Sequence, residues 1–198
     1  MVVCHEKKCI FIHIPKTGGT SIEQFIKDYD KNNLLFIGVR NNRSLQHLTG
    51  FQLMKLIPNI YKKYYKFSIV RNPYDKLLSE YYWNPSNIGY KSGKSKKDFL
   101  KKVSEIIKNK KYYDDIYNDH LIPQYYFIFY KNKLIVNELF KYEDLEWVSN
   151  YLKKKLEIFR NFPYLNKNDI EKEGWTEEEK EIIYDLYKND FLYFGYTK

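Results

Sequence analysis

The chain has 198 residues, enough for a domain with a buried core, and we expect a single domain spanning residues 1–198. Lysine and arginine together number 34 against 25 aspartates and glutamates, which gives a formal net charge of +9. This excess favours an acidic ligand, such as a nucleotide, an acidic polysaccharide or nucleic acid. No apolar run approaches the roughly 18 residues of a membrane span, and the N-terminus lacks a signal-peptide core. We therefore expect a soluble protein without an integral membrane segment.

Two cysteines, Cys4 and Cys9, precede the first predicted strand. Their spacing fits no standard zinc pattern, and the alternation of a strand sends Cys9 and Ile10 to opposite faces. We therefore expect neither a metal site nor a disulfide scaffold here.

Residues 10–14 form an apolar, β-branched run that Pro15 ends, as in a buried strand. Gly18 and Gly19 then permit a turn with close approach of the backbone to a ligand, and Thr20 or Ser21 is suited to cap a following helix. The apolar stripe of that helix is Ile22, Phe25, Ile26 and Tyr29.

A strand, a glycine turn and a helix N-terminus aim backbone N–H groups and the positive end of the helix dipole at one point. Lys16 adds a full positive charge beside that point. The stretch predicts an anion site of the kind that binds phosphate. The phosphate loop of nucleotide hydrolases has its lysine after the glycines, whereas Lys16 precedes them.

A second strand is predicted over residues 34–39, followed by a polar loop over residues 40–44. His47 then enters a short helix that Pro58 ends. A histidine at such a place is ordinarily a surface or capping residue, so its interpretation depends on the motif that follows.

That motif is a strand over residues 67–70, with Arg71 at its carboxyl end and Pro73 in the first turn of a helix that runs through Trp83. Ligands of open α/β sheets bind at the carboxyl ends of strands. Arg71 offers a bidentate guanidinium, and Ser79 lies about two helical turns further on, where a hydroxyl can join it on one phosphate. The motif therefore predicts a second phosphate site.

The segment Pro-Lys-Thr-Gly-Gly-Thr-Ser at residues 15–21 resembles the 5′-phosphosulfate loop of sulfotransferases that use 3′-phosphoadenosine 5′-phosphosulfate (PAPS). Among these enzymes it is most similar to carbohydrate sulfotransferases related to the heparan 2-O and chondroitin enzymes. Arg71 and Ser79 resemble the residues that hold the 3′-phosphate in that family. The resemblance implies these donor-binding residues: Lys16, Thr17, Gly18, Gly19, Thr20, Ser21, Arg71 and Ser79.

The resemblance covers nearly the whole chain. It includes residues 120–124, strands over 126–130 and 139–142, and a terminal helix that opens with a capping box from Thr176 to Glu179. Residues 84–97 and 166–174 are loops by composition. The implied fold is α/β, a single-domain, three-layer arrangement with a central, mostly parallel sheet and a phosphate-binding loop after the first strand.

The implied reaction moves the sulfuryl group of PAPS to an acceptor hydroxyl, with 3′-phosphoadenosine 5′-phosphate (PAP) as product and without a metal. Lys16 would neutralise charge on the departing oxygen, and His47 would be the general base, as in the heparan 2-O branch. His120 is the rival base and, failing that, an acceptor-binding residue. Glu23 is a further alternative base, and His13 is expected to pack beside the loop.

Two functions of other classes stay open: a nucleotide-binding, kinase-like phosphotransferase, and a non-enzymatic module that binds acidic glycan or nucleic acid. A kinase should carry an acidic metal-binding residue where this chain has Arg71. For the sulfotransferase we expect a glycan or other hydroxyl acceptor, acidic or neutral, and no nucleic acid partner. The sequence predicts no oligomeric state and no sulfated position.

Animal enzymes of this type are anchored in the Golgi membrane, whereas this chain begins nine residues before its first predicted strand. We therefore expect either a cytoplasmic enzyme of a microbial or viral source or a Golgi-lumenal catalytic domain.

Overall fold

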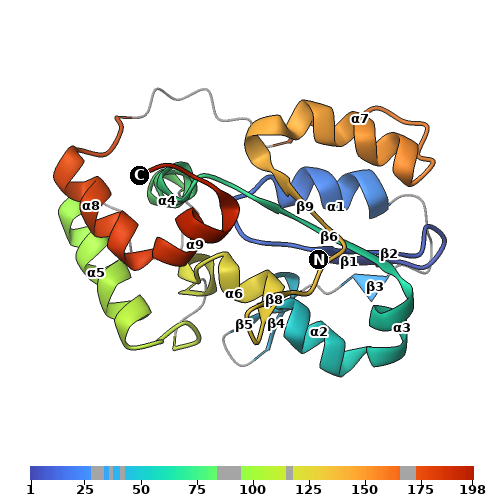
Figure 1. Ribbon diagram of the computed structural model, residues 1–198, viewed down its shortest axis with the longest axis horizontal. Helices are drawn as coiled ribbons and strands as arrows, with labels where there is room; N and C mark the ends of the chain where they lie inside the picture. Colours follow the sequence, from blue (N-terminus) through green and yellow to red (C-terminus); the bar gives the residue numbers. More distant parts are fainter. Residues whose placement is uncertain (28–33, 36–37, 41–42, 84–94, 115–117, 166–172) are drawn as a thin grey trace.

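The computed structural model describes residues 1–27, 34–35, 38–40, 43–83, 95–114, 118–165 and 173–198. Its centre is a five-stranded sheet with the order β3-β1-β2-β6-β9 (Figure 1). The strands are β1 (Val2–Cys4), β2 (Cys9–Ile12), β3 (Leu34–Leu35), β6 (Tyr65–Val70) and β9 (Glu138–Lys141). β2, β6 and β9 are parallel, and β3, antiparallel to β1, runs the same way as β2. β1 alone of these five runs the other way, so the sheet is mostly parallel, as predicted.

The phosphate-loop candidate follows β2 and not the first strand, because β1 forms a hairpin with β2. Val2 pairs with Phe11 and Cys4 with Cys9, and both cysteines are buried in the core. Residues 2–4, which the sequence analysis assigns to no element, are thus a strand, and residues 5–8 form the turn that leads to β2. The pattern of that strand, only three residues long, is too short for periodicity to reveal.

Helices cover both faces of the sheet, as a buried parallel sheet requires. α1 (Gly19–Lys27) and α7 (Leu145–Lys155) lie on one face, where Phe11 and Phe67 pack in one cluster with Phe25. α2 (Gly50–Leu56), α3 (Pro58–Lys63) and α6 (Tyr125–Ile128) lie on the other, where Ile10 and Ile12 pack in one cluster with Leu53. Alternate residues of β2 therefore serve opposite layers, and the predicted three-layer α/β fold is confirmed.

A further group of helices lies beyond the carboxyl ends of the strands (Figure 1). It comprises α4 (Pro73–Tyr82), α5 (Lys96–Lys108), α8 (Glu177–Leu186) and α9 (Lys188–Phe194). These helices share a cluster that includes Leu77, Phe99 and Ile183. The predicted capping box is present, since Thr176 accepts from the Glu179 amide and Glu179 accepts from that of Thr176. The predicted terminal helix is divided into two, because α8 ends before Tyr187 and α9 follows it.

Two local predictions were wrong. Residues 125–128 form helix α6, and only β7 (Phe129–Tyr130) of the predicted strand is extended, because aromatic residues of high strand propensity pack here in a single helical turn. Thr20 and Ser21 do not cap α1, because the helix already begins at Gly19. The prediction that a short helix ends at Pro58 is confirmed, since α2 ends at Leu56 and Pro58 begins a separate helix, α3, at its first position.

The remaining elements are short: β4 (Val39–Arg40), β5 (Arg43–Ser44), η1 (Leu45–His47), η2 (Asn118–Leu121), β8 (Lys133–Leu134) and η3 (Tyr142–Asp144). Of the strand predicted over 34–39, residues 36–37 lie outside the described residues, as do most of the loops predicted at 84–97 and 166–174. Among the helices that the structure describes, none is both long and apolar enough to cross a lipid bilayer.

At Gly19, the first residue of α1, there is no room for a side chain. An ideal Cβ at this position would lie 2.1 Å from Cδ2 and Nε2 of His13, which is buried. We therefore expect Gly19→Ala to lower the free energy of unfolding by about 1–3 kcal/mol, the usual effect of overpacking. Urea denaturation measures it, with Gly174→Ala as control, because nothing lies within 4 Å of a Cβ there. A Gly19→Ala protein as stable as the wild type would contradict this packing.

Candidate functional site

The loop between β2 and α1 has an unusual backbone. Lys16 and Gly18 both have positive φ, +67° and +78°, and a lysine in that region is uncommon. Thr17 is buried and its hydroxyl donates to the Ile14 carbonyl at 2.8 Å, while the Ser21 amide donates to the Gly18 carbonyl at 3.1 Å. The loop is thus held from within, in a conformation that carries strain, as functional loops often do.

The other predicted loop residues differ in their surroundings. Thr20 is exposed, whereas Ser21 is buried and its hydroxyl accepts the Leu165 amide at 3.0 Å. Gly18 lies against Tyr142, whose ring would come within 2.9 Å of a Cβ at that position. The loop and the start of α1 are therefore contacted by two segments distant in the sequence, one at Tyr142 and one at Leu165.

The ammonium group of Lys16 lies 4.5 Å from the centroid of the Trp83 ring. The same indole lies 4.8 Å from the ring of His120. An aromatic face attracts a cation, so Trp83 holds the lysine side chain over the loop and close to a buried histidine. In the sequence, Trp83 is recognisable only as the end of the predicted helix.

Arg71 follows β6 directly, and hydrogen bonds to its backbone hold it in place. The side-chain amide of Gln124 accepts from the Arg71 N–H at 2.9 Å and donates to the Arg71 carbonyl at 2.7 Å. The guanidinium lies 4.3 Å from the centroid of the Tyr142 ring, and its Nη1 donates to the Lys16 carbonyl at 3.3 Å. The structure thus joins the two predicted phosphate motifs through Arg71.

One atom of that guanidinium stands out. Nε of Arg71 is buried and has no hydrogen-bond partner among the described residues. A buried guanidinium N–H without a partner is costly, and a phosphate oxygen is the acceptor that arginine prefers. Ser79 lies in α4, partly buried, on the helix that begins two residues after Arg71.

Three buried histidines of the described chain each donate from Nδ1 to a carboxylate. The pairs are His13 with Glu23 at 2.8 Å, His47 with Asp119 at 3.2 Å, and His120 with Glu80 at 2.9 Å. The rings form a row, with centroids 5.1 Å apart for His13 and His47 and 4.8 Å apart for His47 and His120. Since an ionised carboxylate only accepts, Nδ1 carries the hydrogen in each ring, and in a neutral ring Nε2 keeps the lone pair.

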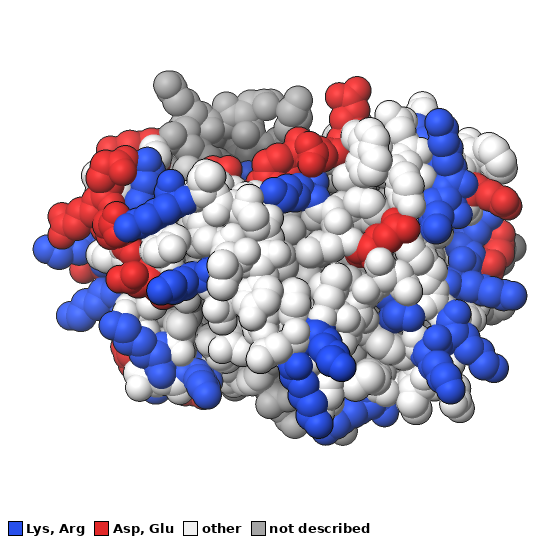
Figure 2. Space-filling model, in the orientation of Figure 1, with Lys and Arg blue, Asp and Glu red and all other residues white. Residues whose placement is uncertain are grey.

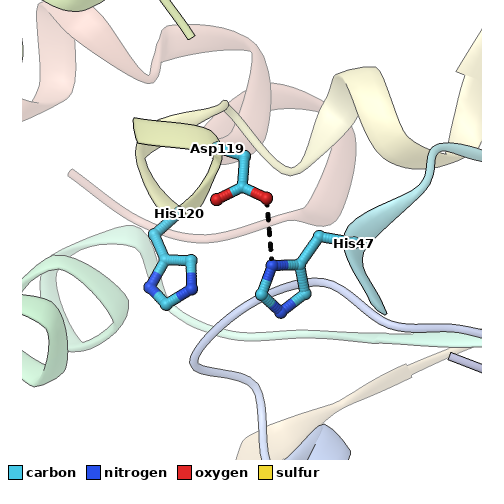
Figure 3. Close-up of side chains that lie close together, drawn as sticks. All are labelled: His47, Asp119 and His120. Carbon is cyan, nitrogen blue, oxygen red and sulfur yellow. Dashed lines mark hydrogen bonds and ion pairs between the residues drawn. The ribbon is translucent and has the colours of Figure 1, made fainter. Parts of the chain in front are cut away.

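The electrostatics of the central pair favour a neutral ring. Burial lowers the pKa of His47 to about 3, against the hydrogen bond to Asp119, which raises it. For Asp119, burial acts to raise the pKa, but the hydrogen bond from His47 outweighs it and the pKa lies below its usual value. At neutral pH the pair is therefore a neutral imidazole held in one tautomer by a carboxylate. Figure 3 shows the carboxylate of Asp119 above His47, with His120 on its other side.

Glu23, the alternative base, is occupied. One of its oxygens accepts from His13 and the other accepts from the Gln46 side chain at 2.6 Å. Burial acts to raise the pKa of Glu23, but the hydrogen bond and charge of His13 lower it to about 2. His13 itself packs on Gly19, beside the loop, as expected.

His47 and His120 stand out in the sequence, but their carboxylate partners, Asp119 and Glu80, do not. Asp119 immediately precedes His120, and Glu80 immediately follows Ser79, so each was adjacent to a residue already singled out. The adjacent titratable residues Asp119 and His120 were the one sequence feature that could have indicated the site. Nothing local, however, indicated that Asp119 would face His47. Gln124 and Tyr142, which hold Arg71, were likewise not recognised as part of the site.

A cavity of about 460 Å³ lies beside Asn72, between α4 and the start of α8. Two lysine–glutamate ion pairs line it: Lys180 with Glu177 at 2.7 Å and Lys198 with Glu181 at 2.6 Å. Because each of these lysines is already paired with a glutamate, the cavity has little attraction for phosphate. The loop and the buried histidines are therefore the better candidates for a functional site.

No curated protein and no solved structure matches the chain. The model of the Sulfotransferase family matches residues 1–197. Because this match covers nearly the full length of the chain, the chain belongs to the Sulfotransferase family.

Proposed function

We propose that this chain, as one catalytic domain over residues 1–198, transfers the sulfuryl group of PAPS to an acceptor hydroxyl on a carbohydrate. The observation that carries the proposal is the buried Nε of Arg71, which has no hydrogen-bond partner in the described part of the chain, on a guanidinium that also donates to the Lys16 carbonyl. A donor with a 5′-phosphosulfate and a 3′-phosphate would supply one anion to the loop and the other to Arg71 and Ser79.

The proposed step is an in-line displacement in which the acceptor oxygen forms a bond to sulfur as the bond from sulfur to the bridging oxygen breaks. Negative charge grows on the bridging oxygen, where the ammonium of Lys16 neutralises it. The acceptor proton passes to Nε2 of His47. This nitrogen has a free lone pair because the hydrogen of the neutral ring is on Nδ1, which donates it to Asp119. PAP then leaves with its two phosphate groups. Asp119 acts as a positioning residue, since it holds the tautomer.

The open alternatives have less support. A kinase-like phosphotransferase would need an acidic metal ligand at the end of β6, where Arg71 stands. A polyanion-binding module would favour a continuous basic surface, whereas lysines and arginines on the face in Figure 2 are dispersed around a largely uncharged centre. Both alternatives are separated from the proposal by nucleotide preference and by turnover.

The first prediction concerns the 3′-phosphate. PAP should bind about 10- to 100-fold more tightly than ADP, since charge-assisted hydrogen bonds are worth about 1.5–3 kcal/mol. Arg71→Lys keeps the charge but loses the planar fork and should remove most of this preference. Titration calorimetry measures both affinities, and Arg160→Lys, a matched change at a guanidinium that bonds the Phe25 carbonyl, serves as control. Equal affinity of the wild type for PAP and ADP would rule out the proposed donor.

The second prediction separates chemistry from binding at Lys16. Lys16→Ala should lower kcat by about 10²–10³ with a smaller change in PAP affinity, because the charge that Lys16 neutralises is largest in the transition state. Lys55→Ala is the control, since Lys55 lies 4.4 Å from the Phe51 ring centroid in a similar cation–π contact on an exposed part of α2. An unchanged kcat at saturating donor in Lys16→Ala would remove Lys16 from the transfer step.

The third prediction concerns the base. His47→Ala should lower kcat by about 10²–10⁴ and leave PAP affinity nearly unchanged, as expected for loss of a general base. Asp119→Asn should also lower kcat at unchanged PAP affinity, because the amide no longer fixes the ring tautomer. Sulfate-transfer assays on a panel of glycans measure both effects, with His5→Ala as control, since His5 pairs with the Tyr64 hydroxyl away from the row of histidines.

His120→Ala distinguishes the rival assignment. A loss confined to acceptor affinity would identify His120 as an acceptor-binding residue and leave His47 as the base. A near-normal His47→Ala enzyme together with an inactive His120→Ala enzyme that still binds PAP would transfer the role to His120.

A further inference from the structure

His47, Asp119 and His120 form a compact group of metal-ligating side chains. All three are buried, and they come from two short turns, η1 and η2, that are distant in the sequence. One ligand atom from each lies within 4.8 Å of the other two. Two imidazoles and a carboxylate are a common set of ligands in transition-metal sites, and here they lie close enough together to share one ion.

The surroundings of His120 resemble those of a metal ligand. Its Nδ1 donates to Glu80 at 2.9 Å, and Nε2 faces Asp119 and His47 (Figure 3). A histidine that binds a metal almost always donates its other N–H to a carboxylate or carbonyl, which fixes the ring and increases its basicity. Glu80, itself buried, already supplies that second interaction.

Asp119 provides an independent observation. The side chain is 2% exposed, and while Oδ2 accepts from His47, Oδ1 is buried without a hydrogen-bond partner among the described residues. In Figure 3 this second oxygen points toward the His120 side of the group. An unpaired carboxylate oxygen in a buried place is costly, and a cation between Asp119 and the two rings would satisfy it.

We propose that His47, Asp119 and His120 bind a divalent transition-metal ion of the Zn²⁺ type, and that the bound ion inhibits sulfuryl transfer. Nitrogen ligands favour Zn²⁺ or Co²⁺ over Mg²⁺ and Ca²⁺, which prefer oxygen. Zn–ligand bonds of about 2.0 Å at tetrahedral angles place ligand atoms roughly 3.3 Å apart, so small side-chain rotations close the group. A water molecule would complete four-coordination.

Inhibition follows from the electron count of the ring. A neutral imidazole has one N–H and one lone pair. A His47 ring that ligates the ion through either nitrogen, with its hydrogen on the other, therefore has no lone pair with which to accept the acceptor proton. This consequence rests on the proposed function of His47 as base, whereas binding of the ion does not. Binding and inhibition therefore need separate measurements.

Binding is tested by titrating the full chain, freed of metal by chelation, with Co²⁺ and recording the visible absorption spectrum. We expect intense tetrahedral bands that saturate at one equivalent and disappear when Zn²⁺ is added. Asp119→Asn and His120→Gln should each weaken Co²⁺ binding by more than 10-fold. Glu80→Gln, which keeps all three ligands, should weaken it by about 10- to 100-fold, the usual effect of losing an outer partner.

The controls are His5→Gln and Asp75→Asn, which should bind Co²⁺ like the wild type, and thermal unfolding identifies variants that fail to fold. A wild-type spectrum of the octahedral aqueous type, or tetrahedral bands that persist in folded Asp119→Asn and Glu80→Gln proteins, would overturn the metal site.

Sulfate-transfer assays with Zn²⁺, with Mg²⁺ as control, then test inhibition. Tetrahedral Co²⁺ binding with full turnover in Zn²⁺ would retain the site but overturn both the inhibition and the role of His47 as base, whereas active enzyme without Co²⁺ binding would overturn the site alone.

Discussion

The contact between the Arg71 guanidinium and the Lys16 carbonyl, at 3.3 Å, links the two halves of the candidate site. It exists because β2 and β6 are parallel neighbours, so that the segments following Ile12 and Val70 leave the sheet at the same edge. β9 pairs with β6 in the same direction and brings Tyr142 against the guanidinium. A shift in the register of these strands would separate the loop from Arg71, and the proposed anion site would be lost.

Features set by adjacent residues were predicted well from the sequence. The apolar run before Pro15, the glycine turn and the strand that ends at Arg71 are each local patterns, and the structure has them as β2, the loop and β6. Helix α6 was missed because aromatic residues favour strands in isolation, and tertiary packing prevailed. The pairing of His47 with Asp119 joins residues 72 positions apart, and such a contact depends on the complete fold.

The buried histidines explain why polar groups are tolerated so close to the sheet. Each ring donates from Nδ1 to a carboxylate, so every Nδ1–H donor has an acceptor although the rings are buried. The three rings are nevertheless not equivalent. His13 is packed on Gly19 and supports the loop, whereas His47 and His120 flank the carboxylate of Asp119. That difference separates a structural histidine from the two that are suited to proton transfer or metal binding.

Hydrogen–deuterium exchange with and without saturating PAP tests most directly whether the loop and Arg71 together hold one nucleotide. We expect slower amide exchange in residues 16–21 and 71–79 when PAP is bound, with no change in the turn at residues 5–8 of the β1–β2 hairpin. Protection confined to the segments around the cavity beside Asn72 and α8, with unchanged exchange in residues 16–21, would contradict this arrangement.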